Sequence, residues 1–186
     1  LIGRRHTVEQ TVESFLLARE LGFDNINMDL IMGLPQETLL DVENTMERLR
    51  ELDPDSVTVH SLAIKRAARL RMFKDDYKDY KMVNTKEHIA LTARIAREMG
   101  MVPYYLYRQK NMAGNFENVG YAREGKEGIY NVLIMEEVQT IVACGAGSIS
   151  KRVYPDGRIE RCENVKDVAQ YIARIGEMVE RKKQLF

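Results

Sequence analysis

Residues 25–38, with the sequence NINMDLIMGLPQET, carry the strongest structural signal in this chain. Apolar side chains occupy alternate positions of this segment, at Ile26, Met28, Leu30 and Met32. A period of two predicts a β-strand that is largely buried, and the Gly33-Leu34-Pro35 sequence predicts the turn that ends it. Asp29 lies inside the strand, and burying a charge is costly unless it meets a partner or a ligand. Asp29 is therefore the first candidate for a functional residue.

Helical patterns flank this strand on both sides. Thr7 and Gln10 have capping-box spacing, which predicts a helix from about Val8 that stops near Gly22. A second helix is predicted over about 39–52, followed by a second strand over 56–64 (SVTVHSLAI). A third capping signal at residues 84–87 precedes another helix and a third strand over 102–107. This alternation predicts βα units, an α/β fold and a parallel sheet.

The character of the sequence changes after Tyr107. Residues 108–130 are rich in Gly, Asn, Arg and Glu, which predicts a long loop. Residues 149–154 and 158–162 flank a Pro-Asp-Gly turn and predict a hairpin. A final helix is expected to follow, with Asn164 as its cap. Its apolar positions, which we expect to be buried, are Val168, Tyr171, Ile172 and Ile175.

The composition limits the classes of function. The 186 residues are 45% hydrophobic and 30% charged, which is typical of a globular protein with one domain or one and a smaller second. We find no apolar run long enough to span a membrane and no secretory signal, so we expect a cytoplasmic protein. The 28 basic and 28 acidic residues cancel, which argues against a general nucleic-acid binder. Cys144 and Cys162 are too far apart to predict a metal site in these residues.

A basic run at residues 65–74 has two interpretations. It could form a surface for phosphates or acidic ligands. Acidic residues follow it at Asp75, Asp76 and Asp79, and they cancel much of its field. We therefore interpret the run as a solvated face with internal charge pairing.

Several motifs, in this order and spacing, resemble the oxygen-independent coproporphyrinogen III oxidases and their relatives in the radical S-adenosylmethionine superfamily. They are IGRRHT, a helix ending in ELGF, NMDLIMGLPQET and PDSVTVHSLAI. The segment YYLYRQKNMAGNFENVGYA resembles a coproporphyrinogen dehydrogenase-like branch, and GAGS resembles the glycine-rich stretch after the barrel. The resemblance covers about residues 1–150. It implies the second half of a partial (β/α)6 radical SAM barrel, residues 1–108, with a small α+β C-terminal extension, residues 109–186.

The same resemblance implies S-adenosylmethionine and a [4Fe-4S] cluster as cofactors. The family holds its cluster with a C-x-x-x-C-x-x-C motif, which is absent here, so we expect the cluster half of the barrel to lie upstream of Leu1. Family members contact S-adenosylmethionine with an arginine at the position of Arg4 and an aspartate at that of Asp29. Ile31 and Ala63 match positions on the adenine side, and Gly33 lets the backbone turn at the strand end where ligands bind.

The chemistry of these residue types agrees with the implied roles. An arginine fork can hold the carboxylate of the cofactor through two hydrogen bonds. A carboxylate can accept hydrogen bonds from the amine and the ribose hydroxyls of the cofactor. The alternative is that Asp29 forms a buried ion pair with Arg4 or a nearby lysine.

A second group of candidates lies where the third strand meets the long loop. These residues are Tyr105, Tyr107, Arg108, Gln109 and Asn111. They could face a porphyrinogen and its propionates, since arginine suits carboxylates, or they could dock the C-terminal part on the barrel. Typical family members carry Asn-Phe-Ala-Arg near this point, so the substrate is left open. We interpret His60 as a packing residue of its strand and expect His6 and His88 at the surface.

The resemblance implies oxidative decarboxylation of coproporphyrinogen III propionates to vinyl groups, a step of haem biosynthesis. This chain alone is expected to be inactive. A haem-binding chaperone on the same barrel and a radical enzyme with another substrate stay open as alternatives. A truncated barrel would expose its cut edge, so we expect dimerisation there. We expect no nucleic-acid or membrane partner.

Overall fold

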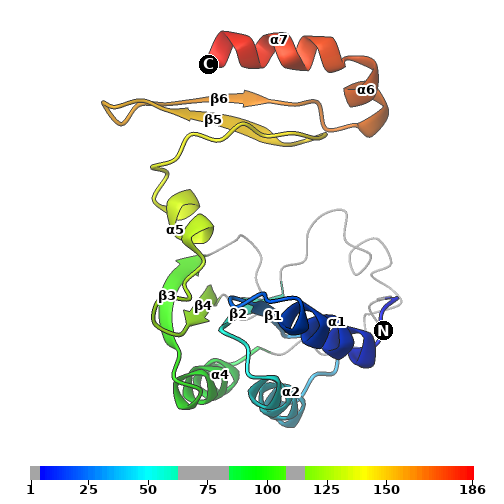
Figure 1. Ribbon diagram of the computed structural model, residues 1–186, viewed down its shortest axis with the longest axis vertical. Coiled ribbons are helices and arrows are strands. Elements are labelled where there is room, and N and C mark those ends of the chain that lie inside the picture. Colours follow the sequence, from blue (N-terminus) through cyan, green and yellow to red (C-terminus); the bar gives the residue numbers. More distant parts are fainter. Residues whose placement is uncertain (1–4, 63–83, 108–115) are drawn as a thin grey trace. The chain divides into compact units, whose positions relative to one another are not determined.

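The computed structural model describes residues 5–62, 84–107 and 116–186 (Figure 1). The chain divides into two compact units, Leu1–Gly128 and Ile129–Phe186. The boundary therefore lies later than residue 108, because strand β4 (Asn118–Ala122) belongs to the sheet of the first unit. The basic run at residues 65–74 lies outside the described residues.

The first unit contains three described helices, and their ends follow local capping signals. They are α1 (Val8–Glu20), α2 (Leu39–Leu52) and α4 (Lys86–Glu98). The predicted capping box of α1 is confirmed, because the Thr7 N–H donates to Gln10 Oε1 at 3.0 Å and the Gln10 N–H donates to Thr7 Oγ1 at 3.3 Å. Thr38 and Asp41 form the corresponding box of α2. None of the described helices has the length and apolar character needed to cross a membrane.

The sheet of the first unit is mixed rather than fully parallel. Its strands are β1 (Asn27–Met32), β2 (Ser56–Ser61), β3 (Val102–Tyr107) and β4, in the order β1-β2-β4-β3. β1 and β2 are parallel as predicted, but β4 is antiparallel to both of its neighbours. The prediction of a continuous loop over 108–130 is wrong, since residues 118–122 form this buried strand. The signal was missed because Asn118 and Gly120 interrupt the apolar pattern.

The hydrophobic core lies between one face of the sheet and helices α2 and α4, which lie on the same side of it in Figure 1. The alternation predicted for β1 is confirmed on this face, where Leu30 is 8% exposed and Met32 is fully buried. Met46 of α2 and Ile95 of α4 are also fully buried. The expectation that Asp29 is buried is wrong, because its side chain lies on the other face and is 63% exposed.

β1 ends the sheet, and β2 is its one partner among the described strands. A groove of about 700 Å³ between α1, β1 and α2 borders this edge and includes Val8 and Val12 in its lining.

The dimer expected at this edge stays a prediction. Sedimentation should show concentration-dependent association, and Val8→Lys should weaken it at least about fivefold by placing a charge in an apolar contact. A monomer at every concentration would contradict it.

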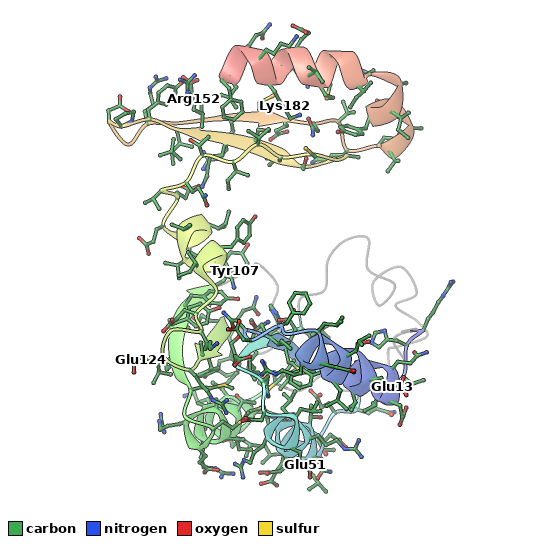
Figure 2. All side chains as sticks on the ribbon, viewed as in Figure 1. Glu13, Glu51, Tyr107, Glu124, Arg152 and Lys182 are labelled. Atoms are coloured by element: carbon green, nitrogen blue, oxygen red, sulfur yellow. The ribbon has the colours of Figure 1, made fainter. Side chains whose placement is uncertain are left out.

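The second unit is a hairpin with helices. Its elements are α5 (Ile129–Met135), β5 (Ile149–Val153), β6 (Ile159–Glu163), α6 (Val168–Ala173) and α7 (Ile175–Leu185). The hairpin prediction is confirmed, with Gly157 at φ +82° in its turn. Two labelled side chains in Figure 2 connect the hairpin region to α7: Arg152 Nη1 donates to the Leu185 carbonyl at 2.8 Å, and Lys182 Nζ donates to Asn164 Oδ1 at 2.6 Å.

The C-terminal helical region differs from its prediction. Asp167, not Asn164, caps α6. Asn164 is buried instead, and its side-chain amide donates to the Gly145 carbonyl and to Ser148 Oγ. None of the four positions expected to be buried is so: Val168, Ile172 and Ile175 are exposed, and Tyr171 is half-buried. The buried apolar residues of this region are Met178 and Leu185 on α7. The helical segment was predicted, but it is divided near Arg174 into α6 and α7, and the prediction of its buried positions is wrong.

Candidate functional site

The candidate site lies on the face of the first sheet that is opposite the hydrophobic core. The strand register places Asp29 beside Thr58, Thr58 beside Gly120, and Gly120 beside Tyr105. These four residues therefore form one row across β1, β2, β4 and β3. His60 lies one step along β2 on the same face, because side chains two residues apart share a face of a strand. Polar and aromatic side chains from β1, β2 and β3 thus meet on one surface, and Gly120 is the β4 member of the row.

Asp29 accepts one hydrogen bond from the same surface and lies close to a histidine. Asn27 Nδ2 donates to Asp29 Oδ1 at 2.8 Å, and His60 Nε2 lies 3.6 Å from the same oxygen. His60 has the largest effect and, together with Asn27, lowers the pKa of the Asp29 carboxyl below its ordinary value, although partial burial opposes this. Asp29 is therefore an anion at neutral pH, and its exposure leaves room for further donors.

The Asn27 side chain is itself oriented by two hydroxyls of β2. Ser56 Oγ and Thr58 Oγ1 donate to Asn27 Oδ1 at 3.2 and 3.0 Å. With its oxygen occupied in this way, the amide directs its nitrogen toward Asp29. Sequence reasoning missed Asn27 and Thr58 and assigned His60 to packing. The available signal was that polar residues alternate with apolar ones, at Asn27 and Asp29 of β1 and at Ser56, Thr58 and His60 of β2.

Two tyrosines cover the middle of the sheet beside this polar row. The register of β3 against β4 is irregular between Pro103 and Tyr105, and as a result both Tyr104 and Tyr105 lie over Gly120. The centroids of the two rings are 4.9 Å apart. A Cβ added at Gly120 would overlap the Tyr105 ring and would lie 2.9 Å from Tyr104 Cε1. Burial raises the pKa of the Tyr105 phenol, so that side chain stays neutral around pH 7. Gly120 therefore makes room for an aromatic surface next to Asp29.

The turn after β1 is closed by a carboxylate. Gly33 has φ +84°, which favours glycine, and its N–H donates to Glu37 Oε2 at 2.6 Å. The Leu34 N–H donates to the same oxygen at 3.2 Å. Burial raises the pKa of Glu37 above its ordinary value, and these two N–H groups lower it by less. The predicted turn is confirmed, and it is sensitive to the charge of Glu37.

Glu37→Gln should stabilise the protein at pH 7. The folded-state pKa of Glu37 is raised, so its stability contribution is complete at low pH and is lost as pH rises through the folded-state pKa. Glutamine keeps an acceptor oxygen for Gly33 and Leu34 without the buried charge. We expect a gain of less than about 1 kcal/mol at pH 7, and none below pH ~4, in urea unfolding. A loss at pH 7 would contradict this interpretation of the turn.

His88 is buried, so the expectation that it lies at the surface is wrong. It is 5% exposed, and its Nδ1 accepts a hydrogen bond from the Thr85 N–H at 3.3 Å. It therefore occupies the third helical position of the α4 capping box, where a glutamate or glutamine is more usual.

The structure brings together only part of the predicted site. Asp29 and Tyr105 meet in the row described above, and Ile31 is half-buried on the same face beside His60. Five predicted residues lie outside the described residues, namely Arg4, Ala63, Arg108, Gln109 and Asn111. The alternative ion pair of Asp29 with Arg4 lies outside them for the same reason.

The described residues fit part of the cofactor chemistry. Within residues 5–62, 84–107 and 116–186, no three His, Cys, Asp or Glu side chains gather as a metal site requires. Cys144 and Cys162 are free thiols of the second unit. The exposed, oriented carboxylate of Asp29 fits a ligand that presents hydroxyl or amine donors. A nucleoside such as that of S-adenosylmethionine carries such donors.

Sequence comparison identifies relatives over nearly the whole chain. No family model matches this chain. It is 44% identical over 182 residues to the oxygen-independent coproporphyrinogen-III oxidase-like protein HemZ of Bacillus subtilis, covering 97% of this chain and 36% of that relative. It is 46% identical over 63 residues to the oxygen-independent coproporphyrinogen III oxidase of Escherichia coli, covering 34% and 14%. It is 41% identical over 64 residues to the heme chaperone HemW of Bacillus subtilis, covering 34% and 17%.

The fold is similar to that of a solved structure. The coproporphyrinogen III oxidase HemN from Escherichia coli, described as a radical SAM enzyme, matches with a TM-score of 0.66 and 21% identity. The match covers 94% of this chain and 39% of that one. The chain thus spans a little over a third of the length of HemZ and of the solved HemN structure. The α/β fold class expected from the sequence is confirmed.

Proposed function

Since this chain belongs to the family of oxygen-independent coproporphyrinogen III oxidases and their relatives, we propose that it is the C-terminal part of a radical SAM enzyme that decarboxylates coproporphyrinogen III propionates. The product would carry vinyl groups in place of propionates, and each conversion would lose a hydrogen atom to the radical, one CO2, and one electron to an electron acceptor outside this chain. The observation that carries the proposal is Asp29, an oriented anion on the face of the sheet opposite the hydrophobic core. The cytoplasm is the compartment we propose for it.

The residues of this chain would bind and orient, and the cofactor would supply the reactivity. When bound at a [4Fe-4S] cluster outside this chain, S-adenosylmethionine supplies the radical that abstracts hydrogen from a propionate side chain. Asp29 would accept hydrogen bonds from its ribose hydroxyls or amine, and Arg4 would hold its carboxylate. Ile31 and Ala63 would cover the adenine, beside the turn at Gly33.

The aromatic surface beside Asp29 supports a place for the substrate. Tyr105 is half-buried on that surface, and Tyr107 follows it on β3. Arg108, Gln109 and Asn111 continue the chain from this strand, and we propose that they face the porphyrinogen. Arg108 would pair with a propionate, since a guanidinium holds a carboxylate through two hydrogen bonds.

Asp29→Asn should weaken S-adenosylmethionine binding by the full-length protein about 10–100-fold, because a charge-assisted hydrogen bond is worth roughly 1.5–3 kcal/mol. Equilibrium dialysis under anaerobic conditions would measure the affinity. Asp24→Asn is the matched control, since the Asp24 side chain is 93% exposed. Equal binding by the Asp29→Asn and wild-type proteins would overturn the cofactor role.

This chain by itself should cleave no cofactor in the presence of a reductant.

A haem chaperone is the second candidate. The local identity to HemW supports it, because that identity is nearly as high as the identity to the oxidase. Product analysis of the full-length protein with coproporphyrinogen III separates the two functions. Vinyl products support the oxidase, whereas tight haem binding without vinyl products supports the chaperone.

A further inference from the structure

We propose that Ser61 and Asn118 are positioning residues that fix the substrate side of the site, on β3 and β4, against its cofactor side, on β1 and β2. The inference rests on the proposed function, in which Asp29 belongs to the cofactor side and Tyr105 to the substrate side. It adds two residues that were not predicted from the sequence. Both act through the strands that carry the site rather than on the reacting atoms.

Ser61 is the last residue of β2 and lies where the two pairs of strands meet. The register pairs it with Met32, the last residue of β1, and the Leu62 N–H donates to the Met32 carbonyl at 2.8 Å. Asn118 is the first residue of β4 and is paired with Tyr107, the last residue of β3. Because β4 is antiparallel to both neighbours, β1, β2 and β3 run in one direction and their carboxyl ends meet here. Ligands bind at this end of such sheets.

Side-chain hydrogen bonds continue the connection between β2 and β4 beyond their backbone pairing. The register of these two strands ends at Val59 and Val119. Two residues further along β2, the Ser61 N–H donates to Asn118 Oδ1 at 3.0 Å. The Ser61 hydroxyl donates to the Glu117 carbonyl at 3.4 Å. The two strand pairs are thus joined at this end through one side-chain amide and one hydroxyl.

A third side chain joins this cluster from the segment that leads into α4. Asn84 Nδ2 donates to Ser61 Oγ at 3.0 Å. The three residues are buried, with Ser61 3%, Asn84 7% and Asn118 4% exposed. A buried polar group that loses its partner is costly, so this arrangement is strongly favoured over alternatives that break it.

The cluster bears on the reaction through the placement of the substrate. Asp29 and Gly33 lie on or directly after β1, whose backbone pairing with β2 does not depend on the cluster. Tyr107 lies at the end of β3, which is linked to β2 at this end through Asn118. Loss of the cluster should therefore shift the substrate relative to the cofactor and leave the cofactor side in place. A displacement of about 1 Å can lower a reaction rate roughly 100-fold.

The first test needs no turnover and compares Ser61→Ala and Asn118→Ala with wild type in the full-length protein. Hydrogen–deuterium exchange in peptides covering β3 and β4 should become at least about fivefold faster in both variants, with β1 unchanged. The affinity for S-adenosylmethionine, measured by anaerobic equilibrium dialysis, should stay within about twofold of wild type. The matched control is Thr92→Val, which removes a buried hydroxyl that bonds to carbonyls of its own helix, α4.

The second test measures the vinyl product formed per S-adenosylmethionine cleaved, with coproporphyrinogen III, a reductant and an electron acceptor. This ratio should fall about tenfold in Ser61→Ala and Asn118→Ala and stay unchanged in Thr92→Val. The ratio is informative because partial unfolding of a sample lowers both quantities equally. Ser61→Cys keeps the size of the side chain with a weaker donor and acceptor, and it replaces Ser61→Ala if that variant fails to fold.

Three results would overturn the inference. They are unchanged exchange in β3 and β4, an unchanged product ratio in both variants, and a loss of S-adenosylmethionine binding as large as that of Asp29→Asn. None of them contradicts the proposed function if the wild-type protein forms vinyl products. A wild-type protein that forms no vinyl product would instead contradict the proposed function itself.

Discussion

Gly120→Val is expected to destabilise the first unit by about 3 kcal/mol, the upper end of the usual cost of overpacking a filled space. Gly120 is buried in β4, and both Tyr104 and Tyr105 lie over it. A Cβ at this position would overlap the Tyr105 ring, so the ring must leave its place on the sheet. The backbone of Gly120 does not require glycine, since its φ is not positive. The loss of stability therefore comes from the overlap of the new side chain with the rings of Tyr104 and Tyr105.

Urea unfolding of single and double variants would test this explanation. Gly176→Ala is the matched control, because a Cβ there meets no atom within 4 Å and alanine favours a helix. It should be neutral or stabilising by up to about 1 kcal/mol. In a Tyr105→Ala background, Gly120→Ala should cost less than in the wild type, since the overlapping ring is gone. Additive effects of the two substitutions would show that the ring is not the cause.

Asp55→Ala should cost about 3 kcal/mol, because it removes a buried acceptor that joins three elements. Asp55 is 7% exposed, and its Oδ2 accepts from the Ile26 N–H at 2.8 Å. The same oxygen lies 2.6 Å from Arg19 Nη1 of α1. The substitution leaves a backbone N–H and a guanidinium without this partner at the start of β1. We reduce the expected cost below that of a fully buried pair, since the Arg19 side chain is 29% exposed.

The pH dependence gives a second measurement on Asp55. Burial raises its pKa, but the Ile26 N–H and the Arg19 guanidinium lower it by more, so the net pKa lies below its ordinary value. Its stabilisation is therefore complete above the unfolded-state pKa, near 3.9, and is lost as pH falls through the lower folded-state pKa. Asp55→Asn should remove this part of the acid transition while keeping an acceptor for Ile26.

The control for Asp55 is Asp24, an exposed carboxylate that lies 3.8 Å from Lys126. Asp24→Ala should cost less than about 0.5 kcal/mol, as is usual for surface ion pairs. A cost for Asp55→Ala no larger than this would mean that the contacts with Ile26 and Arg19 contribute little to folding.

Local signals predicted the helices and the first strands well. The bounds of α2 and the start of α1 follow from caps that act over three residues, at Thr7 and Thr38. The period of two identified β1, and the Asp-Gly sequence identified the hairpin turn at Gly157. These features depend on neighbours in the sequence, so no tertiary contact is needed to predict them.

The candidate site was predicted only in part. Asp29 was singled out for an unusual carboxylate in a strand, and the structure places it beside Asn27 and His60, while its functional role stays a prediction. Its exposure was predicted wrongly, because a period of two defines two faces but not which of them the helices cover. Asn27, Thr58 and His60 were missed, since their relation to Asp29 depends on the register of β1 against β2.

The sequence by itself determined the caps, the turns, the strand period and the family resemblance, because each depends on residues close together or on a motif order. The tertiary structure alone decided that β4 enters the sheet between β2 and β3, that His88 is buried and that Asn27 holds Asp29. These outcomes depend on pairings between residues far apart in the chain, such as Thr58 with Gly120. Such pairings are selected by the packing of the whole unit rather than by any one segment.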